Sequence, residues 1–173
     1  MSALPAHRSR LHRLVFGERG RIAGTVYGTI VVMATLTAGA GSAQDPWQLA
    51  AIVATGVFVL WLAHVYAHAL GESIESGRSV LIAGELAKVA RHELAIPLAA
   101  VAPIAALVLG GLGIVRESRA IWLAVLVCLA TLTVQGIRYA QVERLARSGK
   151  FLAVAVNLGL GLVIVALKAG IAH

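Results

Sequence analysis

The chain has 173 residues, of which 59% are hydrophobic and only 13% are charged, and its formal net charge is +7. A soluble domain carries about 25% charged residues, so the composition indicates a membrane protein with a single domain over residues 1–173. The basic residues lie between apolar runs, without a basic groove or a stacking motif. This pattern excludes a nucleic-acid partner and leaves the lipid bilayer as the expected one.

Five apolar runs follow a polar and basic N-terminal segment, and each has the length of a membrane-spanning helix, about 20 residues. We therefore predict an all-α integral membrane protein with five transmembrane helices, over residues 22–41, 47–71, 94–115, 120–138 and 151–171. The first run ends in small residues, Ala38 to Ala43, which also occur at signal-peptidase sites. The run is as long as a full membrane span, so we expect this helix to be retained and not cleaved.

The first run carries glycine and threonine at helical spacing. Gly24 and Gly28 form a small face on which another helix can pack closely. Thr25, Thr29 and Thr35 add hydroxyl groups to the same helix. Three interpretations stay open at this point: central packing, a dimer contact, or the lining of a narrow pore.

The second run closes on a polar stripe. His64, His68 and Glu72 are spaced four residues apart, and four residues of a helix turn about 400° and rise about 6 Å. The three side chains therefore share one face. Polar groups at membrane depth are costly and usually functional, so this stripe is the strongest candidate site in the sequence.

The third run begins directly after His92 and Glu93, on the same side of the membrane as the end of the stripe. If the second and third helices pack side by side, five side chains converge: His64, His68, Glu72, His92 and Glu93. Imidazole and carboxylate together suit a divalent metal ion, and they also suit a proton relay. Simple polar contacts between helices are the plainer interpretation.

The interval before the third run is amphipathic. Apolar residues recur at helical spacing among charged ones, which predicts a short interfacial helix over about 73–91. Within the third run, Pro97 fits the first turn of a helix, whereas Pro103 is expected to kink it. Gln135 and Asn157, in the fourth and fifth runs, are expected to hydrogen bond across helices or to line a substrate path.

The distribution of lysine and arginine predicts the orientation. Twelve of the fifteen fall on one side: five before the first run, three within 72–92, and four from Arg138 to Lys150. The positive-inside rule then places the N-terminus in the cytoplasm and the C-terminus outside. The excess of arginine over lysine and the abundant alanine are typical of a bacterial protein, so we expect a multi-pass protein of the bacterial inner membrane.

The spacing of Arg21, Gly28, Thr35 and Leu36 resembles the first helix of the endolysosomal potassium-channel family and its bacterial relatives. The stretch 58–64 is similar to the aromatic end of that family's second helix, so the resemblance covers residues 21–68. It implies a tetrameric channel whose first helix lines the pore, with Ile30 or its neighbours at an apolar constriction. Thr25-Val26-Tyr27 stands where the family has Phe-Ser-Asp, and five helices stand where it has six.

We therefore expect a small polytopic membrane protein that acts as an oligomeric channel or transporter for an ion or small solute. We do not expect an enzyme, because no nucleophile stands at motif spacing from a base and no loop is built to hold phosphate. A homo-oligomer is expected because five short helices bury little interior. Two alternatives stay open. One is a membrane protein that binds a divalent metal ion through its histidines and glutamates; the other is a non-catalytic subunit of a membrane complex.

Overall fold

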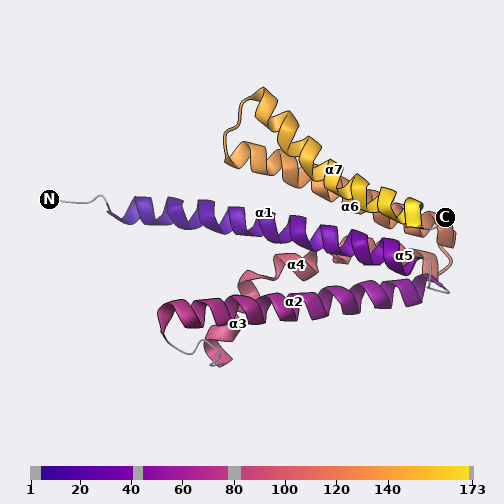
Figure 1. Ribbon diagram of the computed structural model, residues 1–173, viewed down its shortest axis with the longest axis horizontal. Helices are drawn as coiled ribbons and strands as arrows, with labels where there is room; N and C mark the ends of the chain where they lie inside the picture. Colours follow the sequence, from indigo (N-terminus) through magenta and orange to yellow (C-terminus); the bar gives the residue numbers. More distant parts are fainter. Residues whose placement is uncertain (1–4, 41–44, 78–82, 172–173) are drawn as a thin grey trace.

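The computed structural model describes residues 5–40, 45–77 and 83–171, with side chains described over 18–40, 45–75 and 86–166. All regular structure in these ranges is helical. The helices in the described part of the chain are α1 (Pro5–Gly39), α2 (Pro46–Ser76), α3 (Ala83–His92), α4 (Ala95–Leu98), α5 (Val101–Gly111), α6 (Glu117–Val142) and α7 (Arg147–Ile171) (Figure 1).

Four stretches of helix in the described ranges are long and apolar enough to cross a membrane: Glu18–Gly39, Pro46–Glu75, Glu117–Val142 and Arg147–Ala166. A fifth is broken, because Leu86–Leu98 and Val101–Gly111 are inclined to each other by 48°. The described residues thus form an all-helical protein with four such helices, or five if the bent pair forms one span. Its outer faces are apolar, as α7 illustrates with Phe151 at 77% exposure and Leu152 at 63%, and an apolar surface of this kind needs lipid around it.

Helix α1 lies at the centre of the bundle. It packs against α2, α4, α6 and α7 (Figure 1). Val32, Met33 and Leu36 on α1 are fully buried, and they belong to a continuous core with residues of α2, α4, α5 and α6. The first apolar run is therefore an internal helix of a single copy of the chain.

Two prolines divide the region that the sequence presented as one helix over 94–115. Proline lacks an N–H and its ring clashes with the carbonyl four residues earlier. The turn between α3 and α4 falls at Glu93, four residues before Pro97, and the break between α4 and α5 falls at Ala99, four residues before Pro103. The expected kink at Pro103 is present. Pro97 lies in the first turn of a helix, as expected, but that helix is the short α4, which Pro103 separates from α5.

The interfacial helix expected over 73–91 begins later than the sequence suggested. Residues up to Ser76 continue α2, which ends where Gly77 adopts φ 64°, a left-handed conformation that favours glycine. Residues 78–82 lie outside the described ranges. In α3, the buried Val89 packs against Val65 and Ala69 of α2. The apolar face of α3 is thus directed to α2.

Helix α2 begins with a strong capping arrangement. The carboxylate of Asp45 accepts a hydrogen bond from the backbone N–H of Gln48 at 2.7 Å, and Pro46 occupies the first helical position, where its missing N–H costs nothing. These groups fix the point at which the chain re-enters the bundle.

We expect Asp45→Ala to lower the free energy of unfolding by about 1 kcal/mol, because a free N–H is left at the start of α2. Asp45→Asn keeps an accepting oxygen and is the matched control, expected to lose less than half as much. The measurement is unfolding of the purified protein in mixed detergent micelles, followed by circular dichroism. Equal losses in the two variants would contradict the capping role.

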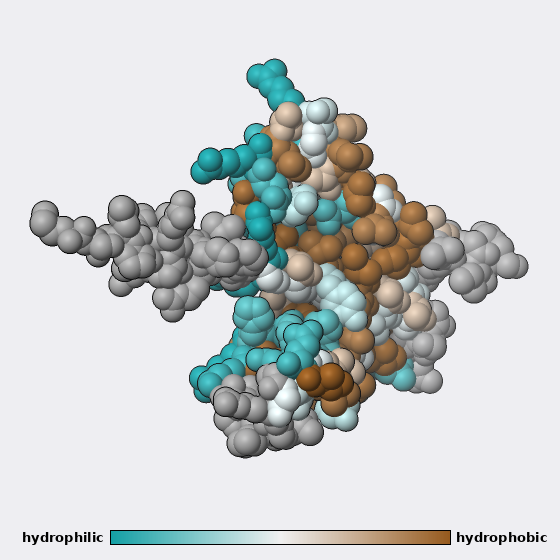
Figure 2. Space-filling model, turned by 60° about the vertical axis from the view of Figure 1, so that its left-hand side comes forward, coloured by the Kyte–Doolittle hydropathy of each residue, from teal (hydrophilic) through white to brown (hydrophobic). Residues whose placement is uncertain are grey.

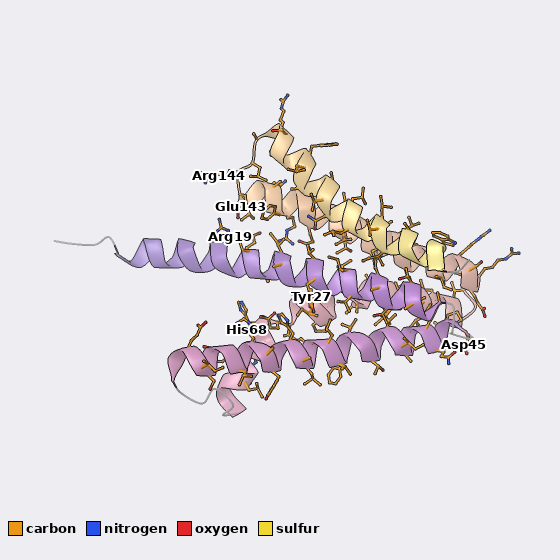
Figure 3. All side chains as sticks on the ribbon, in the orientation of Figure 1. Arg19, Tyr27, Asp45, His68, Glu143 and Arg144 are labelled. Carbon is orange, nitrogen blue, oxygen red and sulfur yellow. The ribbon has the colours of Figure 1, made fainter. Side chains whose placement is uncertain are left out.

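Polar contacts differ at the two ends of the bundle. At one end, α1 and α6 are joined by ion pairs between Arg19 and Glu143 (2.9 Å) and between Arg138 and Glu18 (3.4 Å) (Figure 3). At the other end, Trp47 Nε1 donates to the carbonyl of Gly111 at 2.9 Å. Figure 2 shows hydrophilic side chains gathered toward the first end and a hydrophobic surface beyond them. Which end faces the cytoplasm stays a prediction from the charge count.

Candidate metal centre

Three potential metal ligands meet where α2 faces the turn between α3 and α4. His64 Nε2 lies 3.5 Å from Glu93 Oε2, and His68 Nδ1 lies 3.2 Å from Glu93 Oε1. One donor atom from each residue can be chosen so that all of them lie within 4.8 Å of one another. Each carboxylate oxygen therefore faces one imidazole.

The backbone break places Glu93. Because Pro97 cannot donate to the carbonyl of Glu93, the chain leaves the α3 axis there, and that carbonyl accepts from the N–H of Ile96 instead, at 3.1 Å. The residue is only 9% exposed. A buried carboxylate is stable only when charged or hydrogen-bonding partners compensate its lost hydration, and the two imidazoles are in position to do so.

The spacing on α2 presents both histidines to the same carboxylate. Residues four apart lie on one helix face, and such a histidine pair is a recurrent metal-binding spacing. From Trp47 to His64 the helix rises about 26 Å, which is close to the thickness of a hydrocarbon core, about 30 Å. The His64 and His68 side chains are 40% and 52% exposed, so the site is open at the surface of the protein.

Helix α1 contributes one aromatic neighbour to the site, Tyr27. The ring of Tyr27 lies 5.5 Å from that of His64, centroid to centroid. In Figure 3 the side chains of Tyr27 and His68 both lie between α1 and α2. Sequence reasoning missed Tyr27 as a neighbour of the site, because nothing in its spacing links α1 to the histidines.

The five side chains that were expected to converge divide into two groups. The cluster of the described residues contains His64, His68 and Glu93, and it includes neither Glu72 nor His92. Glu72 lies one further turn along α2. His92 lies beside Gly20 of α1, where a Cβ on that glycine would be 3.3 Å from Nε2. His92, the last residue of α3, and Glu93, in the turn that follows, therefore contact different helices.

The small face of α1 is occupied within the chain itself. A Cβ on Gly28 would lie 2.5 Å from the carbonyl oxygen of Ile96, and a Cβ on Gly24 would lie 3.0 Å from Cβ of Ala95. Ile30 packs against the core. The hydroxyls of this helix donate to carbonyls one turn earlier in α1, as seen for Thr25, Thr29 and Thr35. Of the three interpretations of this face, the geometry supports central packing.

The expected hydrogen bond between Gln135 and Asn157 does not form. Asn157 Nδ2 donates to the carbonyl of Ala153 in its own helix, at 2.9 Å. The buried Oε1 of Gln135 has no hydrogen-bond partner among the described residues. The two residues do lie at the same contact, because Gly136 lets α7 approach to within 3.0 Å of the position its Cβ would occupy.

Comparisons with protein-family models, with curated proteins and with solved structures find no match to this chain. The fold and the site together define its class: an all-helical protein, with four or five helices that could span a membrane, that carries a histidine and carboxylate cluster at one end.

Proposed function

We propose that this protein binds a divalent first-row transition-metal ion reversibly at His64, His68 and Glu93. The observation that supports the proposal is the cluster itself, in which two imidazoles and one carboxylate offer donor atoms within 4.8 Å of one another. Mixed nitrogen and oxygen donors of this kind suit Zn²⁺, Mn²⁺ or Fe²⁺.

The arrangement favours an exchangeable ion over a structural one. Structural zinc sites use four protein ligands in a closed tetrahedron, whereas sites with three protein ligands keep a position for water or a passing ligand. Two of the three ligands here are about half exposed. Metal–nitrogen distances of about 2.0 Å require donors that now lie up to 4.8 Å apart to move closer together, and exposed histidine side chains can rotate to allow this.

Calorimetric titration of the metal-free protein in detergent tests the proposal. We expect one Zn²⁺ per chain, weak or no binding of Mg²⁺ under the same conditions, and weaker Zn²⁺ binding at lower pH because protons compete for the imidazoles. Co²⁺ serves as a coloured probe of the ligand set. Absence of saturable Zn²⁺ binding at neutral pH, or equal binding of Mg²⁺, would refute the proposal.

Passage of the bound ion across the membrane is a second candidate function. This function agrees with the transporter that the sequence predicts. The observation that favours it is the open site with only three protein ligands, because a transported ion must be bound weakly enough to leave. A pore lined by α1 is not favoured, because four other helices of the same chain pack around it.

Uptake of Zn²⁺ into liposomes that contain the protein and an enclosed zinc indicator separates the two roles. Uptake that is lost in Glu93→Gln, with protein orientation and amount matched, would support transport. Saturable binding in detergent without uptake would assign the site to binding alone. The oligomeric state of the same preparation is determined from the molecular mass of the protein in detergent.

A further inference from the structure

A second candidate site lies on the other side of the α3–α4 turn. A cavity of about 560 Å³ lies between α1, the segment from α3 to α5, and α6. Arg21, Arg91, His92 and Arg138 line it, so the side chains come from three parts of the chain that are distant in sequence. The sequence analysis treated these arginines only as orientation signals, because their convergence depends on the packing of α6 against α1.

The charge of this cavity is only partly compensated. Arg138 is 3.4 Å from Glu18, so this guanidinium has a carboxylate partner. Within the part of the chain whose side chains are described, no carboxylate pairs with Arg21 or Arg91. Glu93, which follows His92, is directed to α2 and contacts the other two histidines. The cavity therefore presents a net positive charge that a bound anion would balance.

Part of the cavity lining is apolar and exposed. Leu94 and Leu98 line it, one helical turn apart, and they are 42% and 63% exposed. A cavity for a small anion needs no such apolar surface. Arginine and exposed leucine side chains in one cavity fit a molecule with an anionic head and a hydrocarbon tail.

We propose that this cavity binds an anionic phospholipid, with the phosphate held by Arg21 and Arg91 and one acyl chain along Leu94 and Leu98. Guanidinium groups hold phosphate through paired N–H donors. Basic pockets between membrane helices at the headgroup level are suited to such lipids. Arg21 stands at the start of the apolar part of α1, at the same end of the bundle as the ion pairs of Arg19 and Arg138, so the cavity opens where headgroups lie.

Native mass spectrometry of the purified full chain tests the proposal. The protein is mixed with equimolar phosphatidylglycerol and phosphatidylcholine of the same chain length, and the ratio of the two bound lipids is measured. We expect a strong preference for phosphatidylglycerol that falls about 30-fold in Arg21→Gln with Arg91→Gln, because each basic residue near an anionic headgroup contributes about fivefold. Both side chains are exposed, so the variant is expected to fold, and its circular dichroism is recorded to verify this.

Arg116→Gln with Arg119→Gln is the matched control, because it removes the same charge at the opposite end of the bundle. An unchanged lipid ratio in this control supports a local site. An equal fall in the control, or an unchanged ratio in the Arg21 and Arg91 variant, would overturn the proposal. Full displacement of the lipid by millimolar inorganic phosphate would also overturn it, since it would indicate a site for small anions.

Discussion

Gly28→Leu is expected to lower the free energy of unfolding by about 3 kcal/mol or more, enough to prevent stable folding. The Cβ alone would lie 2.5 Å from the carbonyl oxygen of Ile96 and 3.0 Å from its Cα. Both atoms belong to the backbone of α4, so no side chain can turn aside to make room. Overpacking of a close contact costs about 1–3 kcal/mol even where side chains can adjust. The measurement is unfolding of the purified variant in mixed micelles.

Gly71→Leu provides the matched control on α2. Nothing lies within 4 Å of the position its Cβ would take, and the residue is exposed. The same substitution there is expected to leave stability unchanged or raise it by up to about 1 kcal/mol, because leucine favours the helix over glycine. Comparable losses in both variants would show that the contact between α1 and α4 is not as close as described. The prediction also affects any transport assay, since lost flux in Gly28→Leu would report unfolding and not a blocked pore.

His64→Ala combined with His68→Ala is expected to weaken Zn²⁺ binding by at least about 100-fold. Changes to residues that only support a metal ligand already cost about 10–100-fold, and this variant removes two ligands and leaves Glu93 alone. Calorimetric titration at neutral pH measures the loss. Stability is expected to fall as well, because the buried carboxylate then lacks its imidazole partners.

His92→Ala is the control for this second prediction. It removes a histidine from the same region without touching the cluster, because His92 lies beside Gly20 and lines the cavity with the arginines. Zn²⁺ affinity is expected to stay within about twofold of the wild type. A loss as large as that of the double variant would mean that the metal binds elsewhere and would refute the assignment of His64 and His68.

Hydropathy and local chemistry were sufficient to predict the helices. The apolar runs correspond to α1, α2, α6, α7 and the bent segment. Most bounds differ by a few residues, but α1 begins at Pro5, well before the apolar run at residue 22, because a helix ends at a turn and not where hydrophobicity ends. Gly77 stops α2 several residues after the apolar run closes. The prolines also carried more information than was used. Pro97 stands four residues after Glu93, and this spacing alone indicates that the chain bends at the carboxylate.

The candidate site could be predicted only in part, because helical spacing determines which residues share a face but not which faces meet. The pairing of His64 with His68 follows from the spacing on α2, whereas the choice of Glu93 over Glu72 and His92 depends on how α3 packs on α2. The contact of Tyr27 with His64 and the gathering of three arginines around one cavity are likewise products of tertiary packing.

The short turn after α3 joins the two proposed sites. Glu93 contacts the histidines of α2, while its neighbours Arg91, His92 and Leu94 line the arginine cavity on the other side. A ligand that shifts this backbone at one site is then expected to change the other. By thermodynamic reciprocity, any factor by which a metal ion changes lipid affinity is the factor by which the lipid changes metal affinity. Four consecutive residues would then make the metal affinity of this protein depend on the composition of the bilayer around it.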